Sequence, residues 1–154
     1  MDKISNHISI AESTRSNTAS RLNISNTPDA DTIVNMRTVA EKVFEPLREW
    51  VGEPIKINSF YRSPDLNKAI GGSKKSQHCK GQAIDIYDTY CSATNAEMFT
   101  YIKNNLDFDQ LIWEFGNASN PDWVHVSYVS EEENRNRILA ASKDNTGKTV
   151  YSIV

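Results

Sequence analysis

Residues 82–88, Gln-Ala-Ile-Asp-Ile-Tyr-Asp, carry the clearest pattern in the sequence and predict a central β-strand of the fold. Apolar and polar residues alternate here with the two-residue period of a β-strand that buries one face. The two Ile side chains share that face, so Asp85 takes the opposite one. Residues 123–127, Trp-Val-His-Val-Ser, repeat the arrangement with two Val side chains on one face and His125 on the other. Each strand is therefore predicted to bury an aliphatic pair behind one potential metal ligand.

The remaining pattern predicts helices first and strands later. Helices are expected from about Ile10, from Thr27-Pro28-Asp29 along the apolar stripe of 33–50, over 64–70 and over 94–105, on the basis of capping boxes, Pro at helix starts and apolar periodicity. Pro46 should kink or end the second of these. Strands are expected over 55–62, 82–88, 109–115, 123–129, 137–141 and 149–153, the last two joined by a hairpin loop. This order predicts an α+β fold whose central antiparallel sheet is flanked by helices.

Length and charge narrow the class of protein. The 154 residues predict a single domain, 1–154, with a helical N-terminal preface at 1–26 packed on it. The 17 basic and 20 acidic side chains leave no basic excess, which argues against nucleic acid or an anionic membrane surface as the partner. No apolar run approaches the roughly 20 residues of a membrane span. The opening residues lack the features of a secretory signal, so a cytoplasmic protein is expected, with Cys79 and Cys91 as reduced thiols.

A metal set can be assembled from the two strands and the loop before the first. His78 precedes Asp85 by seven residues, in a Gly- and Ser-rich approach that can fold back over the same sheet face as His125. Two imidazoles and one carboxylate are zinc donors, and three protein ligands leave the fourth tetrahedral position open to water, as in catalytic sites. The open site lowers the pKa of water to about 7. Manganese or cobalt could occupy the same set.

Other residues compete for the remaining catalytic roles. A carboxylate is needed as general base, and Asp122 is the first candidate provided that it lies in the turn before its strand. Glu114 on the preceding strand is the alternative. Arg62 is either a partner in a surface salt bridge or a clamp for a substrate carboxylate or oxyanion. A single His or Asp on a strand is more often structural than a ligand, so the prediction depends on the combination.

Four segments resemble one known family. Residues 76–85 resemble the S-x-H-x-x-G-x-A-x-D signature of the zinc D-alanyl-D-alanine carboxypeptidase family, which includes D-Ala-D-Ala dipeptidases and phage L-alanyl-D-glutamate endopeptidases. Residues 122–125 resemble its second motif, an acidic residue three before the last His. The segment 59–72 is similar to the one that carries the family's active-site Arg, and 16–28 resembles the phage and prophage branch.

The resemblance implies a set of roles and a fold. It implies zinc on His78, Asp85 and His125, Asp122 as general base, Arg62 on substrate or oxyanion, and Ser76 near the substrate or behind the ligands. Many carboxypeptidase members have Glu at the base position. This chain has Asp there, as the endopeptidase members do. The implied fold is the α+β unit shared with lysostaphin-type peptidases and the hedgehog signalling domain.

The implied activity is hydrolysis of an amide bond in peptidoglycan stem peptides, of the D-Ala-D-Ala carboxypeptidase or the L-Ala-D-Glu endopeptidase type. A monomeric phage or prophage endolysin is expected, held in the host bacterial cytoplasm until its release to the wall. The alternative is a catalytically silent zinc module that binds cell-wall peptide or a protein partner.

Overall fold

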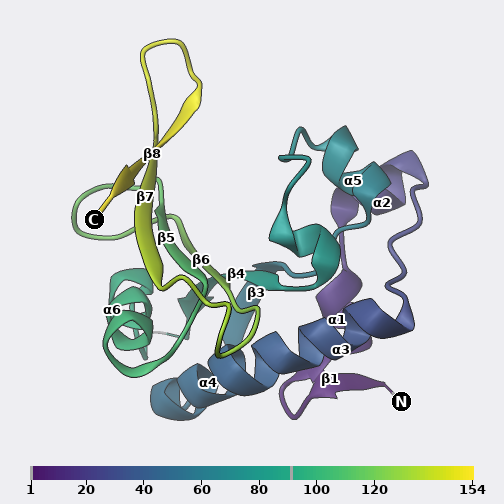
Figure 1. The fold of residues 1–154 in the computed structure, drawn as a ribbon, viewed down its shortest axis with the longest axis horizontal. Coiled ribbons are helices and arrows are strands. Elements are labelled where there is room, and N and C mark those ends of the chain that lie inside the picture. Colours follow the sequence, from purple (N-terminus) through teal and green to yellow (C-terminus); the bar gives the residue numbers. More distant parts are fainter. Residues whose placement is uncertain (1, 91) are drawn as a thin grey trace.

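A six-stranded β-sheet in the order β3-β4-β6-β5-β7-β8 organises the molecule (Figure 1). The structure, a computed structural model, describes residues 2–90 and 92–154. The strands are β3 (Ile55–Ser59), β4 (Ala83–Thr89), β5 (Gln110–Glu114), β6 (Trp123–Ser127), β7 (Arg137–Lys143) and β8 (Thr149–Ile153). All six expected strands are present, although β3 ends at Ser59 and not at Arg62, and β7 continues to Lys143. The predicted α+β class is confirmed.

One pair of neighbours departs from the expected antiparallel sheet, because β5 and β7 run parallel. The chain leaving β6 does not turn back beside it but crosses the end of β5 and adds β7 on the far side. Since β7 runs opposite to β6, and β6 is antiparallel to β5, β7 must run parallel to β5. The buried Asp109 carboxylate holds the crossing loop, since it accepts hydrogen bonds from the backbone N–H and the guanidinium of Arg135.

The helices and a short N-terminal hairpin complete the chain. They are β1 (Lys3–Ser5), β2 (Ile8–Ser9), α1 (Ile10–Thr14), α2 (Asn17–Leu22), α3 (Ala30–Val39), the π-helical η1 (Ala40–Phe44), α4 (Glu45–Val51), α5 (Pro64–Ala69), the 3-10 helix η2 (Gln77–Lys80) and α6 (Asn95–Asn105). Ser9, Ser63 and Thr94 cap α1, α5 and α6 through their side chains, as the sequence predicts. The β1–β2 hairpin is too short to show a strand period, and the sequence analysis missed it.

Pro46 does not end the second helix. The helix runs through α3, η1 and α4 to Val51, and its widened π turn comes just before the proline. The N–H of Glu45 donates to the carbonyl of Ala40, five residues earlier. This wider turn accommodates Pro46, which has no N–H to donate, without ending the helix. None of the helices in the described part of the chain combines the length and apolar character of a membrane span.

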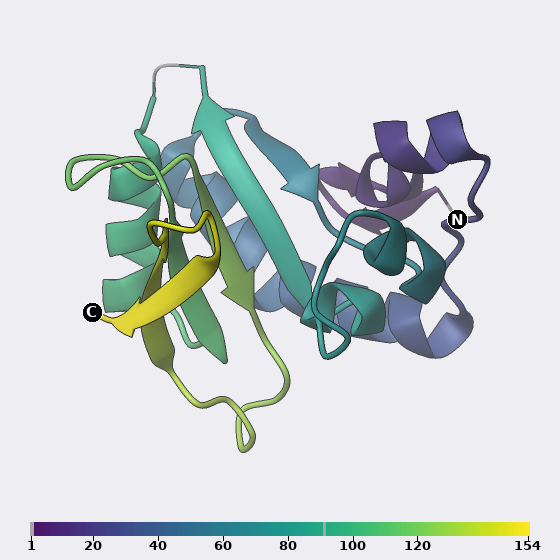
Figure 2. The same ribbon diagram turned by 90° about the horizontal axis from the view of Figure 1, so that it is seen from above.

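The main core lies on one face of the sheet. Figure 2 shows α6 and the α3–α4 helix behind the strands, where they cover the aliphatic pairs of β4 and β6. The fully buried core side chains there include Met36, Val43, Leu47, Ile84, Ile86, Met98, Ile102, Val124 and Val126. The opposite face carries a smaller apolar cluster of Ile112, Leu139 and Ala141, and no helix of the main core covers it in the described part of the chain. Because one face is filled by helices, polar side chains on the other face are free to form a site.

Replacing Gly81 tests how tightly the turn that carries His78 is seated against α3. Gly81 has φ +71°, and an added Cβ would lie 2.7 Å from the carbonyl oxygen of Thr32. Gly147 has φ +83° but open space around it, so it is the matched control. We expect Gly147→Ala to cost about 1 kcal/mol through backbone strain and Gly81→Ala about 2 to 4 kcal/mol through strain plus the clash. Urea unfolding measures both, and equal losses would contradict the packing described here.

Candidate metal centre

Strand pairing brings two of the predicted ligands together. Asp85 of β4 lies directly opposite His125 of β6 in the antiparallel register, with both side chains on the open face of the sheet. The 3-10 helix η2 follows a loop that returns over this face and adds His78. One potential ligand atom from each of the three residues lies within 4.8 Å of the others. The third histidine of the chain, His7, pairs instead with Glu45.

The hydrogen bonding of His78 leaves one ring nitrogen available for a cation. Nδ1 lies 2.7 Å from the carbonyl oxygen of Phe60, which can only accept, so Nδ1 carries the proton. Nε2 is buried, has no hydrogen-bond partner among the described residues, and lies 3.3 Å from Oδ2 of Asp85. A nitrogen lone pair and a carboxylate oxygen thus face each other in a buried space. A metal ion between them would satisfy both groups.

The buried charges of the cluster depend on one another. Burial raises the pKa of Asp85, but the charges of His78 and His125 and the hydrogen bond of His125 outweigh it and hold the pKa well below its usual range. Burial lowers the pKa of His78, with a net downward shift, so its neutral form is favoured. His125 is also desolvated, yet its 2.9 Å contact with Oδ1 of Asp85 produces a net rise in pKa. The ionised Asp85 and the neutral His78 are in the protonation states that metal ligands require, and His125 would lose its proton when an ion binds.

Arg62 and Ser76 lie beside the cluster, as expected from the sequence. One guanidinium nitrogen of Arg62 is 3.4 Å from the hydroxyl of Ser76, and the same hydroxyl accepts the backbone N–H of His78. Burial lowers the pKa of Arg62, while the charges of Asp85 and Glu114 oppose this shift. The sequence offered a surface salt bridge as one alternative for this arginine. The structure places it half-buried, with its Nε lacking a partner among the described residues.

The two candidate general bases occupy different surroundings. Glu114 pairs with Trp123 in the β5–β6 register and shares the sheet face of His125, where it is 8% exposed. Burial raises its pKa to about 7, and the charge of Asp85 adds to the rise. Asp122 is exposed and lies in a bend just before β6, outside the strand, which is the position that its candidacy as the base requires. The structure therefore places Glu114 on the sheet face that carries the cluster, and Asp122 in the bend that precedes β6.

Two polar residues that carry no functional motif, Asn26 and Asp109, hold the loops of the site in place through hydrogen bonds. The side chain of Asn26 donates to the carbonyls of Thr14 and Tyr61 and accepts the N–H of Ser63, so it fixes both sides of Arg62. Asp109 accepts from the side chain of Gln77, at the start of η2. Their signal in the sequence is only an Asn and an Asp in polar loops. Nothing local distinguishes them from other loop residues.

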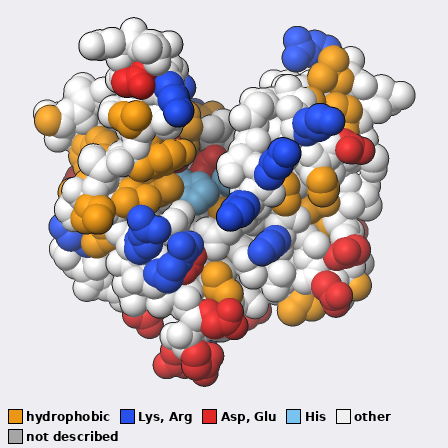
Figure 3. Space-filling view, turned by 45° about the horizontal axis from the view of Figure 1, so that its top comes forward, with side chains coloured by type: hydrophobic (Ala, Val, Ile, Leu, Met, Phe, Trp, Pro, Cys, Tyr) orange, Lys and Arg blue, Asp and Glu red, His pale blue; other side chains and the backbone are white. Residues whose placement is uncertain are grey.

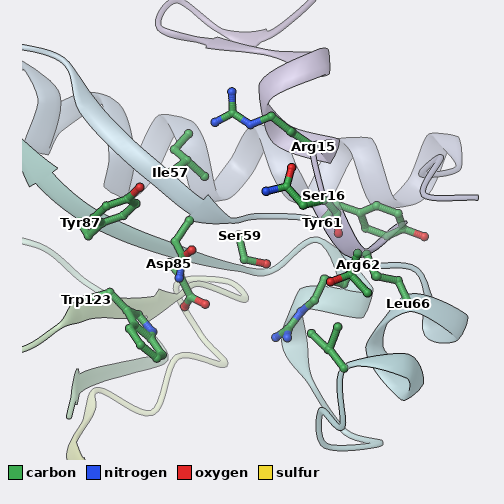
Figure 4. Close-up of a pocket in the computed structure, with 14 residues that line it drawn as sticks. Arg15, Ser16, Ile57, Ser59, Tyr61, Arg62, Leu66, Asp85, Tyr87 and Trp123 are labelled. Carbon is green, nitrogen blue, oxygen red and sulfur yellow. The ribbon is translucent and has the colours of Figure 1, made fainter. Parts of the chain in front are cut away.

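Asp85 of the cluster lines a cleft of about 440 Å³. Figure 3 shows a histidine at its floor, hydrophobic side chains on the β8 side and a row of Lys and Arg side chains on the α2 and α5 side. Asp85, Tyr87 and Trp123 line one end (Figure 4), and Arg62 reaches in from the other wall. The cleft can therefore hold an extended ligand next to the cluster.

Of the two cysteines predicted to be reduced, Cys79 is a free thiol, and Cys91 lies outside the described residues.

Comparison with known proteins identifies the family. A family model described as Peptidase M15 matches residues 6–127, which include every residue of the cluster. This chain belongs to the Peptidase M15 family. A search of curated proteins finds no significant match. Membership confirms the resemblance found in the sequence and supports peptidase activity.

The donor set of this Peptidase M15 member fits the metal of its family. Members are zinc metallopeptidases, and imidazole nitrogen with carboxylate oxygen is a normal zinc ligand set. Three protein ligands are offered by His78, Asp85 and His125. The unpartnered Nε2 of His78, aimed at a carboxylate, is the observation in this structure that calls for an ion. The cluster can therefore hold a zinc ion with one coordination position left for solvent or substrate.

The raised pKa of Glu114 predicts how metal-free protein responds to pH. Between pH 4.5, its ordinary pKa, and about 7, the unfolded carboxyl has lost its proton while the folded one keeps it. Folding then takes up a proton, so the free energy of unfolding falls as pH rises through this window. Glu114→Gln removes the effect and should be more stable than wild type at pH 8 by at most about 3 kcal/mol, but equally stable near pH 4.5. Denaturation in chelator at both pH values measures this, and a pH-independent difference would refute it.

Proposed function

We propose that this chain is a zinc-dependent peptidase that hydrolyses an amide bond in the stem peptides of bacterial peptidoglycan. The observation that carries the proposal is the buried lone pair of His78 Nε2 facing Asp85 beside His125, in a chain of the Peptidase M15 family. These three residues would hold the ion. When bound, zinc supplies a Lewis acid that polarises a carbonyl and lowers the pKa of water.

The general base is Glu114 in this proposal. Its carboxylate shares the sheet face of His125, and a pKa near 7 suits a group that must accept and return a proton at neutral pH. It would take a proton from the attacking water and pass it to the nitrogen of the leaving amine. Asp122, which the sequence motif favours, remains the alternative, and it requires a turn of the segment before β6 toward the cluster.

Arg62 would bind the substrate or the developing oxyanion. Its guanidinium is desolvated and has an unpartnered Nε, so a substrate oxygen would satisfy a donor that the described residues leave free. The hydroxyl of Ser76 accepts a hydrogen bond from the guanidinium of Arg62 and also caps η2, the helix that carries His78. The two roles are therefore coupled, since a shift of Ser76 would move both the arginine and a metal ligand.

The biological role proposed is that of a phage or prophage endolysin. The resemblance of residues 16–28 to the phage branch supports it. We propose a monomer, with residues 1–154 as one domain, that stays in the host cytoplasm until it is released to the wall. Its partner would be the stem peptide, with no nucleic acid and no insertion into a membrane. Either the D-Ala-D-Ala or the L-Ala-D-Glu bond is the target.

Turnover of purified peptidoglycan tests the activity. Zinc-loaded protein should release a new amine from Gram-negative or Gram-positive sacculi, and mass spectrometry of the fragments identifies the bond. Glu114→Gln should lower kcat at least about 100-fold with bound zinc unchanged, because general-base catalysis contributes on this scale. Asp122→Asn is the matched variant and should retain activity. The reverse result would make Asp122 the base.

Metal analysis tests the ligand set separately from activity. We expect one zinc ion per chain after dialysis, lost in His78→Ala and in Asp85→Ala. Cys79→Ser, beside His78 but not in the cluster, should keep the ion. Protein that binds zinc in this way and binds stem peptide without cleaving it would instead be the silent binding module. Hydrolysis undiminished by complete removal of metal would refute the proposal.

A further inference from the structure

The cleft extends well beyond the metal cluster, and its far end carries a charge that the proposed chemistry does not use. Three of its lining residues are charged, namely Arg15, Arg62 and Asp85. Asp85 is already engaged by two imidazoles. The lining away from the cluster therefore has positive charge without an acidic partner.

Arg15 is the cation that stands apart. It forms no hydrogen bond or ion pair with a residue of 2–90 or 92–154, and it ends α1, an element remote in sequence from the cluster. Figure 4 shows its side chain extending from α1 with Ile57 between its guanidinium and Asp85 in this view, while Arg62 comes from a different segment. Two guanidinium groups thus enter one cleft from separate elements.

The backbone holds these two arginines in a fixed relation. The N–H of Tyr61 donates to the carbonyl of Ser13, and the side chain of Asn26 bridges the carbonyls of Thr14 and Tyr61 at 2.8 and 3.1 Å. Both flanks of Arg62 are therefore tied to the residues just before Arg15. The Arg15 side chain is exposed, but the backbone from which it projects is held in place beside the cleft.

We propose that Arg15 binds a second carboxylate of the substrate, remote from the scissile amide, and makes the enzyme selective for acidic peptides. The inference rests on the proposed function and deepens it. Arg62 serves the end near the cluster, and Arg15 serves the far end. Guanidinium binds carboxylate through paired, charge-assisted hydrogen bonds, which a carboxamide cannot fully replace.

The apolar part of the cleft lining fits the remainder of such a ligand. Ile57, Leu66 and Ile70 also line the cleft and can contact a short aliphatic chain. A stem peptide offers free carboxylates on its D-glutamate and on the diamino acid that follows in Gram-negative walls. Both have the required chemistry, so the experiment must separate them.

Peptides that differ in one carboxylate test the inference. Three stem peptides are compared, namely the parent, one amidated only at the D-glutamate carboxylate and one amidated only at the diamino acid. Wild type should lose about tenfold or more in kcat/KM on one of these amidations, mainly through KM. That discrimination ratio should collapse about tenfold in Arg15→Gln and stay unchanged in Arg21→Gln, an exposed arginine of α2 that does not line the cleft.

The outcomes separate the two proposals. Cleavage of all three peptides with the same ratio in wild type and Arg15→Gln would overturn the role of Arg15 and leave the proposed function standing. If wild type cleaves none of them, the proposed function fails, and calorimetric binding of the parent and amidated peptides decides the inference. Weaker binding of the parent peptide alone by Arg15→Gln would support it, and equal binding would overturn it.

Discussion

The site depends on the register between β4 and β6. Because Asp85 lies opposite His125, a carboxylate and an imidazole meet on one sheet face while aliphatic pairs anchor the other face in the core. A shift by one residue would bury the charged groups and expose the core, so packing fixes the register very strongly. The hydrophobic effect on one side thus sets the position of the metal ligands on the other.

The loops over the open face depend on polar contacts rather than on packing. His78 is aimed by its hydrogen bond to Phe60, Arg62 by the bonds of Asn26 on either side, and η2 by the contact of Gln77 with Asp109. Such bonds are individually worth about 1 kcal/mol, but they leave few alternative arrangements for the loops. The same bonds tie the end of α1 to the segment of Arg62, which joins the metal cluster and the far end of the cleft into one surface.

Environment, more than residue type, separates the acidic groups of the site. Asp85 is held ionised by two imidazoles, Glu114 is made a weaker acid by burial, and Asp122 stays exposed. Carboxyl groups pushed toward different pKa values can take different roles, one as ligand and one as base. The motif alone favours Asp122 by its spacing from His125, whereas burial and sheet face favour Glu114.

From the sequence alone came the six strands of the main sheet, the helices capped by Ser9, Ser63 and Thr94 and the faces of Asp85 and His125, because hydrophobic period and caps are local properties. It also carried the family signature around His78. Only the tertiary structure decided the parallel pairing of β5 with β7, which depends on where a loop held by Asp109 crosses the sheet. It alone buried Glu114 on the sheet face of His125 and brought Arg15 to the cleft, since burial and the meeting of distant segments are set by the packing of the whole chain.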